Sequence, residues 1–336
     1  MRTSRRALLA MTACLLMAPV AVAAPQTGYA YYEIGDVTAP TSAPRAAGLM
    51  LMGGGDWDYG AFRWFAARAG HGHIVVLRAS GEADAGEEIY REVGGVSSVQ
   101  TLVFSSREAS NDPKVLDILR HADGIFIAGG DQANYVHYWM DTPVARLLDE
   151  HVRAGRPIGG TSAGLAILGG TAYGAMDGGS IDAATALGDP TGPAVTLVTG
   201  FLHLPRMAHV VTDTHFTVRN RLGRLIAFLA KARASDPQAI GIGVDEKSSL
   251  CVEADGSARL HGPAGTYAWL VEPRGRLRTS PGRPLDWSDI RITGIGLDSR
   301  FDLTSRRVTA PAFSGVARVD GGRLLGVPTP PAARAK

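Results

Sequence analysis

The segment Gly159–Gly164 has the sequence GGTSAG, which places one serine among residues with minimal side chains. A strand that turns sharply into a helix leaves no room for side chains beside the turn, and the pattern Gly-x-Ser-x-Gly is typical of such a nucleophile elbow. Pro157-Ile158 precedes it as the end of a predicted strand. We therefore take Ser162 as the candidate nucleophile. A glycine-rich turn with an incidental serine is the alternative, and the pattern alone gives the two interpretations equal weight.

Short apolar runs alternate with stretches of helix length before this segment. The runs cover residues 48–52, 73–77, 99–104 and 124–128, and the helical stretches cover about 62–69, 87–92, 113–121 and 131–153. Short β-branched runs that each precede an amphipathic helix indicate parallel strands covered on both faces. We expect a doubly wound, mostly parallel α/β sheet.

The pattern changes after Ser248 to short alternating strands separated by Asp-Gly and Pro-Gly turns, as far as about Val308. Such a pattern predicts antiparallel hairpins, here as an extension of the same domain. The expected organisation is a signal peptide (1–23), an extended segment without periodicity (24–47), a catalytic α/β domain (48–249), a hairpin extension (250–327) and a frayed tail (328–336).

The N-terminus has the features of a secretory signal peptide. Three arginines lie within the first six residues, residues 7–20 are apolar, and Ala21–Ala23 offers a cleavage site with small residues. A membrane anchor is the alternative, but the apolar run is short for a spanning helix and contains Pro19. We expect a secreted or periplasmic protein with no membrane association after cleavage. Only Cys251 then remains, so an internal disulfide is excluded.

Composition excludes some partners. The 336 residues include 45% hydrophobic and 20% charged residues, which is typical of a globular protein with ample core. The net charge of +2 is small and evenly spread, so we expect no nucleic-acid partner.

His215 is the candidate general base, and three arginines follow it at Arg219, Arg221 and Arg224. Helical neighbours lie three or four residues apart, so Arg219 and Arg221 cannot share one face. Either the helix begins late or one arginine is structural. A solvated, salt-bridged surface is the plain alternative. Beside a predicted serine nucleophile, we interpret His215 as the base and the arginines as donors for a substrate carboxylate.

Two strand ends contribute further candidates. The turn Gly129–Gly130 lets the backbone approach a ligand and offers an N–H group for an oxyanion hole. Gln132 follows as a substrate contact, with helix capping by Asp131 an equally weighted interpretation. A strand predicted over 239–244 delivers Asp245-Glu246, one of which orients the histidine, but the sequence separates these two acids poorly.

Other motifs give negative or open results. The loop Gly53–Gly55 lacks the spacing of a nucleotide-binding motif, so a tight strand-to-helix turn near the site is favoured. His203, His209 and His215 recur every six residues, which matches no standard metal spacing, and we expect neither metal nor cofactor. Residues 169–204 are rich in glycine, alanine, threonine and proline, which indicates a long loop that forms a lid or rim.

Four motifs in order resemble the cyanophycinase family of serine peptidases, relatives of bacterial aspartyl dipeptidase. They are the elbow at Gly160–Gly164, the turn Gly129–Gln132, the segment Asp213–Leu225 with its histidine and arginines, and Asp245-Glu246. The resemblance covers about residues 48–249. It implies a class I glutamine-amidotransferase-like fold, a peptide substrate such as cyanophycin or another (β-)aspartyl peptide, and no cofactor. A homodimer is left open.

The resemblance also implies the site residues. Ser162 attacks, His215 is the base, Glu246 orients it, and backbone N–H groups at Gly130 and Ala163 form the oxyanion hole. The substrate contacts it implies are Gln132, Asp213, Thr214, Arg219, Arg221 and Arg224. Thr214 stands where similar cyanophycinases usually have glutamine, which bears on the preference for β-Asp-Arg.

Two other functions were weighed. An esterase of the α/β-hydrolase type has its acid before its histidine, and Asp177 or Asp182 could fill that place, but the histidine-arginine segment disfavours it. A secreted binding protein without catalysis is the alternative from a different class, and the presence of Ser162, His215 and Glu246 argues against it.

Overall fold

The computed structural model describes residues 28–331. The predicted signal peptide at 1–23 and the last five residues of the predicted tail lie outside the described part. Within residues 28–331, none of the helices combines the length and the apolar character that crossing a membrane requires.

The first sheet has ten strands in the order β1-β4-β3-β5-β6-β2-β11-β12-β16-β17. Its parallel centre contains the predicted apolar runs and the strand before the elbow: β2 (Gly48–Met52), β3 (His73–Arg78), β4 (Ser98–Phe104), β5 (Gly124–Ile127) and β6 (Ile158–Thr161). These strands are almost entirely buried, as expected for strands covered on both faces. The α/β class and its parallel core are therefore as predicted.

Helices cover both faces of this centre. One face packs against α1 (Tyr59–Arg68) and against α2 (Asp84–Glu88) with the π-helical turn Ile89–Val93, through an apolar cluster that includes Phe62, Phe65 and Ile89. The other face packs against α3 (Pro113–His121), which follows a 3₁₀ turn at Glu108–Asn111, and against α4 (Gln132–Trp139) and α5 (Pro143–Arg153).

Both ends of the first sheet are antiparallel. β1 (Tyr29–Gly35) pairs along its whole length with β4, so part of the predicted extended segment is an edge strand. Its sequence YAYYEIG shows no clear alternation of buried and exposed residues, and pairing through the backbone does not require such an alternation. At the opposite end lie β11 (Ser249–Glu253), β12 (Ser257–His261), β16 (Arg300–Asp302) and β17 (Arg307–Thr309).

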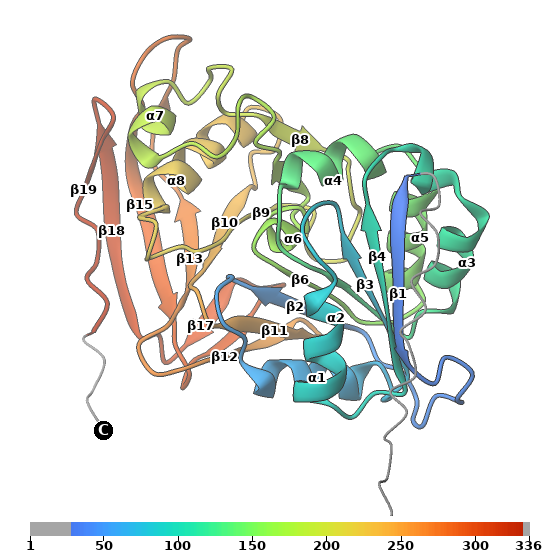
Figure 1. Ribbon diagram of the computed structural model, residues 1–336. Coiled ribbons are helices and arrows are strands. Elements are labelled where there is room, and N and C mark those ends of the chain that lie inside the picture. The colour runs from blue at the N-terminus through green and yellow to red at the C-terminus, as the bar shows by residue number, and fades with distance from the viewer. Residues whose placement is uncertain (1–27, 332–336) are drawn as a thin grey trace, which may run out of the picture.

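The expectation of one doubly wound sheet is wrong, because a second sheet with the order β19-β18-β15-β13-β10-β9-β7-β8 stands beside the first (Figure 1). β11 pairs with the free edge of β2, so β9 and β10 form their own sheet instead of extending the first. The hairpins after Ser248 are antiparallel as predicted, but they are divided between the two sheets. The strands of the second sheet are β7 (Thr171–Tyr173), β8 (Leu197–Thr199), β9 (Val210–Asp213), β10 (Ile240–Val244), β13 (Ala268–Pro273), β15 (Asp286–Ile295), β18 (Phe313–Asp320) and β19 (Arg323–Leu325), with β14 (Leu277–Arg278) paired to β15.

Two helix predictions need correction. The helix expected over 131–153 is split into α4 (Gln132–Trp139) and α5 (Pro143–Arg153), because Pro143 begins a new helix and Asp141 has a φ of 59°. The region 169–204 is not a loop throughout, since it contains β7, α7 (Ala183–Gly188) and β8. These elements have three to six residues, too few for a periodic pattern to appear in the sequence.

The glycines of the elbow are required by close backbone contacts. A Cβ at Gly160 would overlap the carbonyl of Gly164, and a Cβ at Gly164 would overlap the carbonyl oxygen of Ile127 on β5. The turn from β6 into α6 (Ala163–Ala166) therefore fits beside β5 only without side chains at these positions, as the sequence pattern predicted.

We expect Gly164→Ala to lower the free energy of unfolding by about 1–3 kcal/mol, the usual cost of overpacking, because the obstructing atoms belong to the backbone. Gly188→Ala is the matched control, since nothing lies within 4 Å of its added Cβ. Urea unfolding followed by circular dichroism measures both. Equal stability of the two variants would contradict the close contact.

Candidate active site

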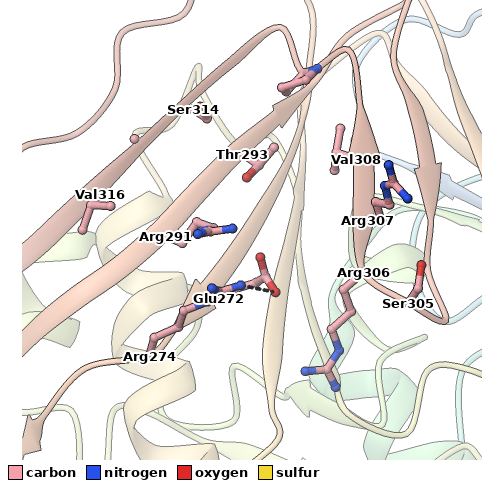
Figure 2. A pocket seen from close by; sticks show the side chains of 12 residues that line it. Glu272, Arg274, Arg291, Thr293, Ser305, Arg306, Arg307, Val308, Ser314 and Val316 are labelled. Carbon is pink, nitrogen blue, oxygen red and sulfur yellow. Dashed lines mark ion pairs between the residues drawn. The ribbon is translucent and has the colours of Figure 1, made fainter.

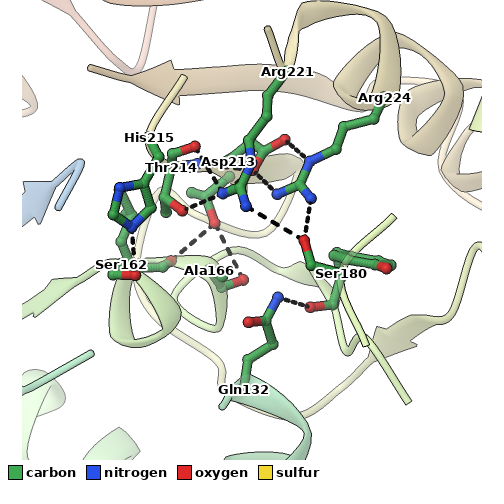
Figure 3. A network of polar contacts seen from close by, with 12 residues as sticks. Gln132, Ser162, Ala166, Ser180, Asp213, Thr214, His215, Arg221 and Arg224 are labelled. Carbon is green, nitrogen blue, oxygen red and sulfur yellow. Dashed lines mark hydrogen bonds and ion pairs between the residues drawn. The ribbon is translucent and has the colours of Figure 1, made fainter. Parts of the chain in front are cut away.

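Ser162 lies at the end of β6 with a φ of 52° and a ψ of −119°. Such a backbone is costly for a residue with a side chain and persists only where the surroundings enforce it. The Ser162 N–H donates to the carbonyl of Met52, and Oγ lies 2.7 Å from Nε2 of His215 (Figure 3). The helix that follows, α6, is only four residues long.

His215 lies on the turn after β9 and is held by its backbone and its ring. Its N–H donates to the carbonyl of Gly53 at 2.7 Å, and Nδ1 lies 2.5 Å from Oε1 of Glu246. Gly54, with a φ of 107°, lies directly against the imidazole, and any Cβ there would overlap the ring. The loop Gly53–Gly55 is therefore a tight turn at the site, as favoured over a phosphate loop.

The structure separates the two acids that the sequence could not. Asp245 is buried: one of its oxygens accepts hydrogen bonds from the N–H and hydroxyl of Thr217, and the other accepts from the N–H of Tyr267. Glu246 is half-buried and faces the imidazole of His215. Asp245 therefore joins the segment of Thr217 to the segment of Tyr267. Glu246 instead completes a continuous row of hydrogen bonds with His215 and Ser162.

Burial lowers the pKa of His215 below its ordinary value. The hydrogen bond and charge of Glu246 oppose this shift, and the positive charges of Arg219 and Arg221 add to it. The net direction of the pKa shift is downward, which favours the neutral imidazole, the form whose Nε2 accepts a proton.

Asp213 and Arg224 form a buried pair in the same network. Arg224 donates from Nε and Nη2 to the two carboxylate oxygens at 2.8 and 2.5 Å, and each side chain is 2% exposed. Its Nη1 donates to Ser180 Oγ and to the carbonyl of Ile181. Arg224 and Asp213 are therefore buried and bound to each other. Their expected role as substrate contacts stays a prediction.

Arg221 is buried without a carboxylate of its own. Its Nη1 donates to the carbonyl and the hydroxyl of Thr214, both at 2.9 Å, and Nη2 donates to Ser180. The nearest carboxylate oxygen, on Asp213, is 3.7 Å away and already bound by Arg224. Burial lowers the pKa of Arg221 to about 10.

The position of the arginines follows from the late start of the next helix. α8 (Leu222–Ala232) begins after Arg221, so His215 to Arg221 lie on a turn, and the alternative of a late helix is the correct one. Arg219 is exposed on this turn.

The turn after β5 reaches the nucleophile. Gly129 lies against the Ser162 side chain, Asp131 caps α4, and Gln132 Nε2 donates to the carbonyl of Tyr173 at 3.4 Å. The capping prediction is thus confirmed. The oxyanion roles of the Gly130 and Ala163 N–H groups stay predictions.

Ser180 and Tyr173 belong to the network although no sequence pattern indicates them. Ser180 accepts hydrogen bonds from both buried arginines, and the Tyr173 ring stacks on Phe228, with Arg224 5.4 Å from its centroid. Both residues lie in the region 169–204, where no pattern distinguishes one residue from its neighbours.

The other two histidines of the six-residue series have separate partners. His203 bonds to Asp149 and His209 to Asp236. Within the described part of the chain, no group of three or more His, Cys, Asp or Glu side chains is arranged to hold a metal ion. The absence of a metal stays a prediction.

The His215 imidazole should titrate below the ordinary histidine value of about 6.5. Glu246→Gln should lower the midpoint further, because it removes the charge that favours the imidazolium. Two-dimensional NMR of the imidazole, assigned by its loss in His215→Gln, measures both midpoints. A midpoint above 6.5 in the unaltered protein would show that Glu246 outweighs burial.

Comparison with known proteins identifies the family. The model of Peptidase family S51 matches residues 84–260. A cyanophycinase of Trichormus variabilis is 30% identical over 280 residues, 79% of this chain and 88% of the relative, and one of Synechococcus elongatus is 36% identical over 204 residues, 60% and 58% of the two chains. The crystal structure of a peptidase from an acI-B1 Actinobacterium has a similar fold, with a TM-score of 0.50 at 15% identity over 76% of this chain and 97% of that one. The chain therefore belongs to peptidase family S51 and is a serine peptidase homologous to the cyanophycinases.

Proposed function

We propose that this peptidase hydrolyses cyanophycin or related β-aspartyl peptides through an acyl-enzyme on Ser162. The names of its relatives support the polymer as substrate. The observation that carries the proposal is the buried Arg221 guanidinium near His215, which has no carboxylate of its own. A peptide that brings a carboxylate to this arginine would supply the missing charge.

In the proposed mechanism, Ser162 Oγ attacks the scissile carbonyl while its proton passes to His215 Nε2. Glu246 holds the imidazole in the required tautomer and stabilises its charge. The N–H groups of Gly130 and Ala163 donate to the oxyanion. The imidazolium then gives its proton to the leaving amine, and a water, deprotonated by the same histidine, releases the acid product and restores Ser162.

Substrate recognition follows from the charges in the network. Asp213 carries one negative charge and faces two guanidinium groups, of which Arg224 takes both carboxylate oxygens. The wall beside His215 therefore keeps an excess positive charge on Arg221, where low exposure limits screening. Arg219 adds an exposed cation. Asp213 and Arg224 position Arg221 in this proposal, which revises their expected role as direct substrate contacts.

Thr214 belongs to the same network because its hydroxyl accepts from Arg221. Because the threonine side chain is short, the Arg221 guanidinium lies close to the backbone of the turn that carries Thr214. An aspartyl dipeptidase or another small-peptide hydrolase is the alternative within the same chemistry. Assays on cyanophycin and on a panel of α- and β-aspartyl dipeptides distinguish the two, since only a polymer hydrolase prefers the long substrate.

The proposal includes the location of the protein. A cleaved signal peptide at residues 1–23 would send the peptidase to the periplasm or outside the cell, where peptides are encountered as nutrients. The class I glutamine-amidotransferase-like topology implied by the family resemblance belongs to the same proposal.

Ser162→Ala should lower kcat by several orders of magnitude on any peptide that the protein cleaves, since no other residue replaces the nucleophile. The melting temperature should not fall, because the substitution removes only a half-buried hydroxyl. Retention of more than about a tenth of kcat would remove Ser162 from the mechanism, since even modest general-base catalysis contributes more.

Arg221→Lys should reduce kcat/KM on β-aspartyl peptides about 10-fold or more, because one charge-assisted hydrogen bond to the substrate carboxylate is lost. Hydrolysis of an uncharged activated ester should change little. Arg224→Lys is the comparison: it breaks the bidentate pair with Asp213, so it should lower stability and reduce the hydrolysis of both substrates together. Equal losses on both substrates for Arg221→Lys would make this arginine structural as well.

A further inference from the structure

A groove of about 580 Å³ lies outside the active-site network, between the second sheet and the β16–β17 hairpin (Figure 2). One side is formed by residues of β13, β15 and β18 and by the turn after β13. The other side is formed by residues 305–308, which include the start of β17. No residue of the groove takes part in the proposed mechanism.

The side chains that line this groove are strongly basic. Arg274 and Arg291 lie on the sheet side, and Arg306 and Arg307 lie on the hairpin side. Glu272 is the carboxylate among the lining residues, and it lies 3.6 Å from Arg274. The other three arginines form no ion pair within the described residues. Since the whole chain has a net charge of only +2, this groove concentrates positive charge in one place.

The edge of the first sheet forms part of the same groove. β17 is the last strand in the order of that sheet and pairs only with β16, so one row of its backbone N–H and C=O groups is unpaired. Arg307 and Val308 of β17 line the groove. A free strand edge accepts an extended peptide by main-chain hydrogen bonds, while side chains beside it provide specificity.

The groove also offers apolar contacts. Val308 and Pro311 line it, as does Val316, which is 57% exposed on β18. Its lining includes no aromatic residue, although single-stranded nucleic acids are usually bound by stacking of their bases on aromatic rings. The combination of arginines, small apolar residues and a free strand edge thus fits a polypeptide better than a nucleic acid.

We propose that this groove binds an extended, carboxylate-rich polypeptide segment beside β17 and is a second binding site of the peptidase, separate from the place of cleavage. Arginines bind carboxylates with paired hydrogen bonds, so each acidic side chain can be held at a defined position. The proposal rests on the chain being a peptidase and not on the aspartyl specificity proposed above. A long acidic chain held here would raise the local concentration of its remaining part near the enzyme.

The test uses the Ser162→Ala protein, so that cleavage does not interfere, and a fluorescein-labelled peptide of ten aspartates. Fluorescence anisotropy at low salt should show saturable binding, and Arg291→Gln with Arg307→Gln should raise Kd at least 10-fold. Arg63→Gln, at an exposed position on α1, is the matched control and should leave Kd within twofold. Val316→Asp is a second variant that keeps all four arginines and should also weaken binding.

Melting temperatures show whether each variant is folded, and kcat/KM of the same groove substitutions in the active enzyme on a short peptide should be unchanged. Unchanged Kd in both folded groove variants overturns the proposal. Equal affinity for a decamer of asparagine, or for a single-stranded deoxythymidine decamer, also overturns it, because the site would then not recognise an acidic peptide. None of these binding results depends on which peptide bond the enzyme cleaves, so failure here is distinct from failure of the proposed function.

Discussion

Backbone hydrogen bonds at Gly53 and Gly54 join the two sheets at the place where the site is built. The carbonyl of Gly53 accepts from His215 N–H at 2.7 Å, the carbonyl of Gly54 accepts from Lys247 N–H at 2.8 Å, and Gly53 N–H donates to the carbonyl of Ser248 at 3.0 Å. A side chain at Gly53 would overlap the carbonyls at the end of β10. The end of β2 is thus fixed to the turns that carry the imidazole and its carboxylate, and the hydrogen-bonded row from Ser162 to Glu246 depends on this junction.

Burial of charge gives the site its electrostatic character. In the buried pair of Asp213 and Arg224, two direct hydrogen bonds and further bonds to neighbouring groups oppose the cost of desolvating both charges. Arg221 donates at hydrogen-bond distance only to neutral acceptors, and its ion pair with Asp213 is longer, at 3.7 Å. In the proposed function this cation binds the substrate carboxylate. The same cation helps to keep the His215 imidazole neutral, and recognition and base strength are thereby coupled in one cluster.

Much of the fold and site could be predicted from the sequence wherever local sterics or periodicity decide the structure. The glycines around Ser162 predict the elbow because a larger residue would overlap the backbone there. β2 is predicted with its observed bounds because it is a continuous apolar run that ends at Gly53-Gly54-Gly55. Ser162 and His215 are predicted because each lies at a turn whose residue types suit the chemistry, and Asp245-Glu246 because it lies at a strand end. The choice of Glu246 from these two acids comes only from the family resemblance.

Only the tertiary structure decided what depends on contacts between distant segments. The division into two sheets follows from the pairing of β11 with β2, which no local pattern records. Asp245 and Glu246 are adjacent and chemically alike, but they face different parts of the structure. Asp245 accepts a hydrogen bond from the N–H of Tyr267, and Glu246 faces the imidazole of His215. Likewise, the sequence gives Arg221 and Arg224 the same expected role, whereas in the structure Arg224 binds both oxygens of Asp213 and Arg221 donates to Thr214. The sequence determines which charged side chains are present and which turns the backbone can form. Packing determines the partner that each of these side chains has.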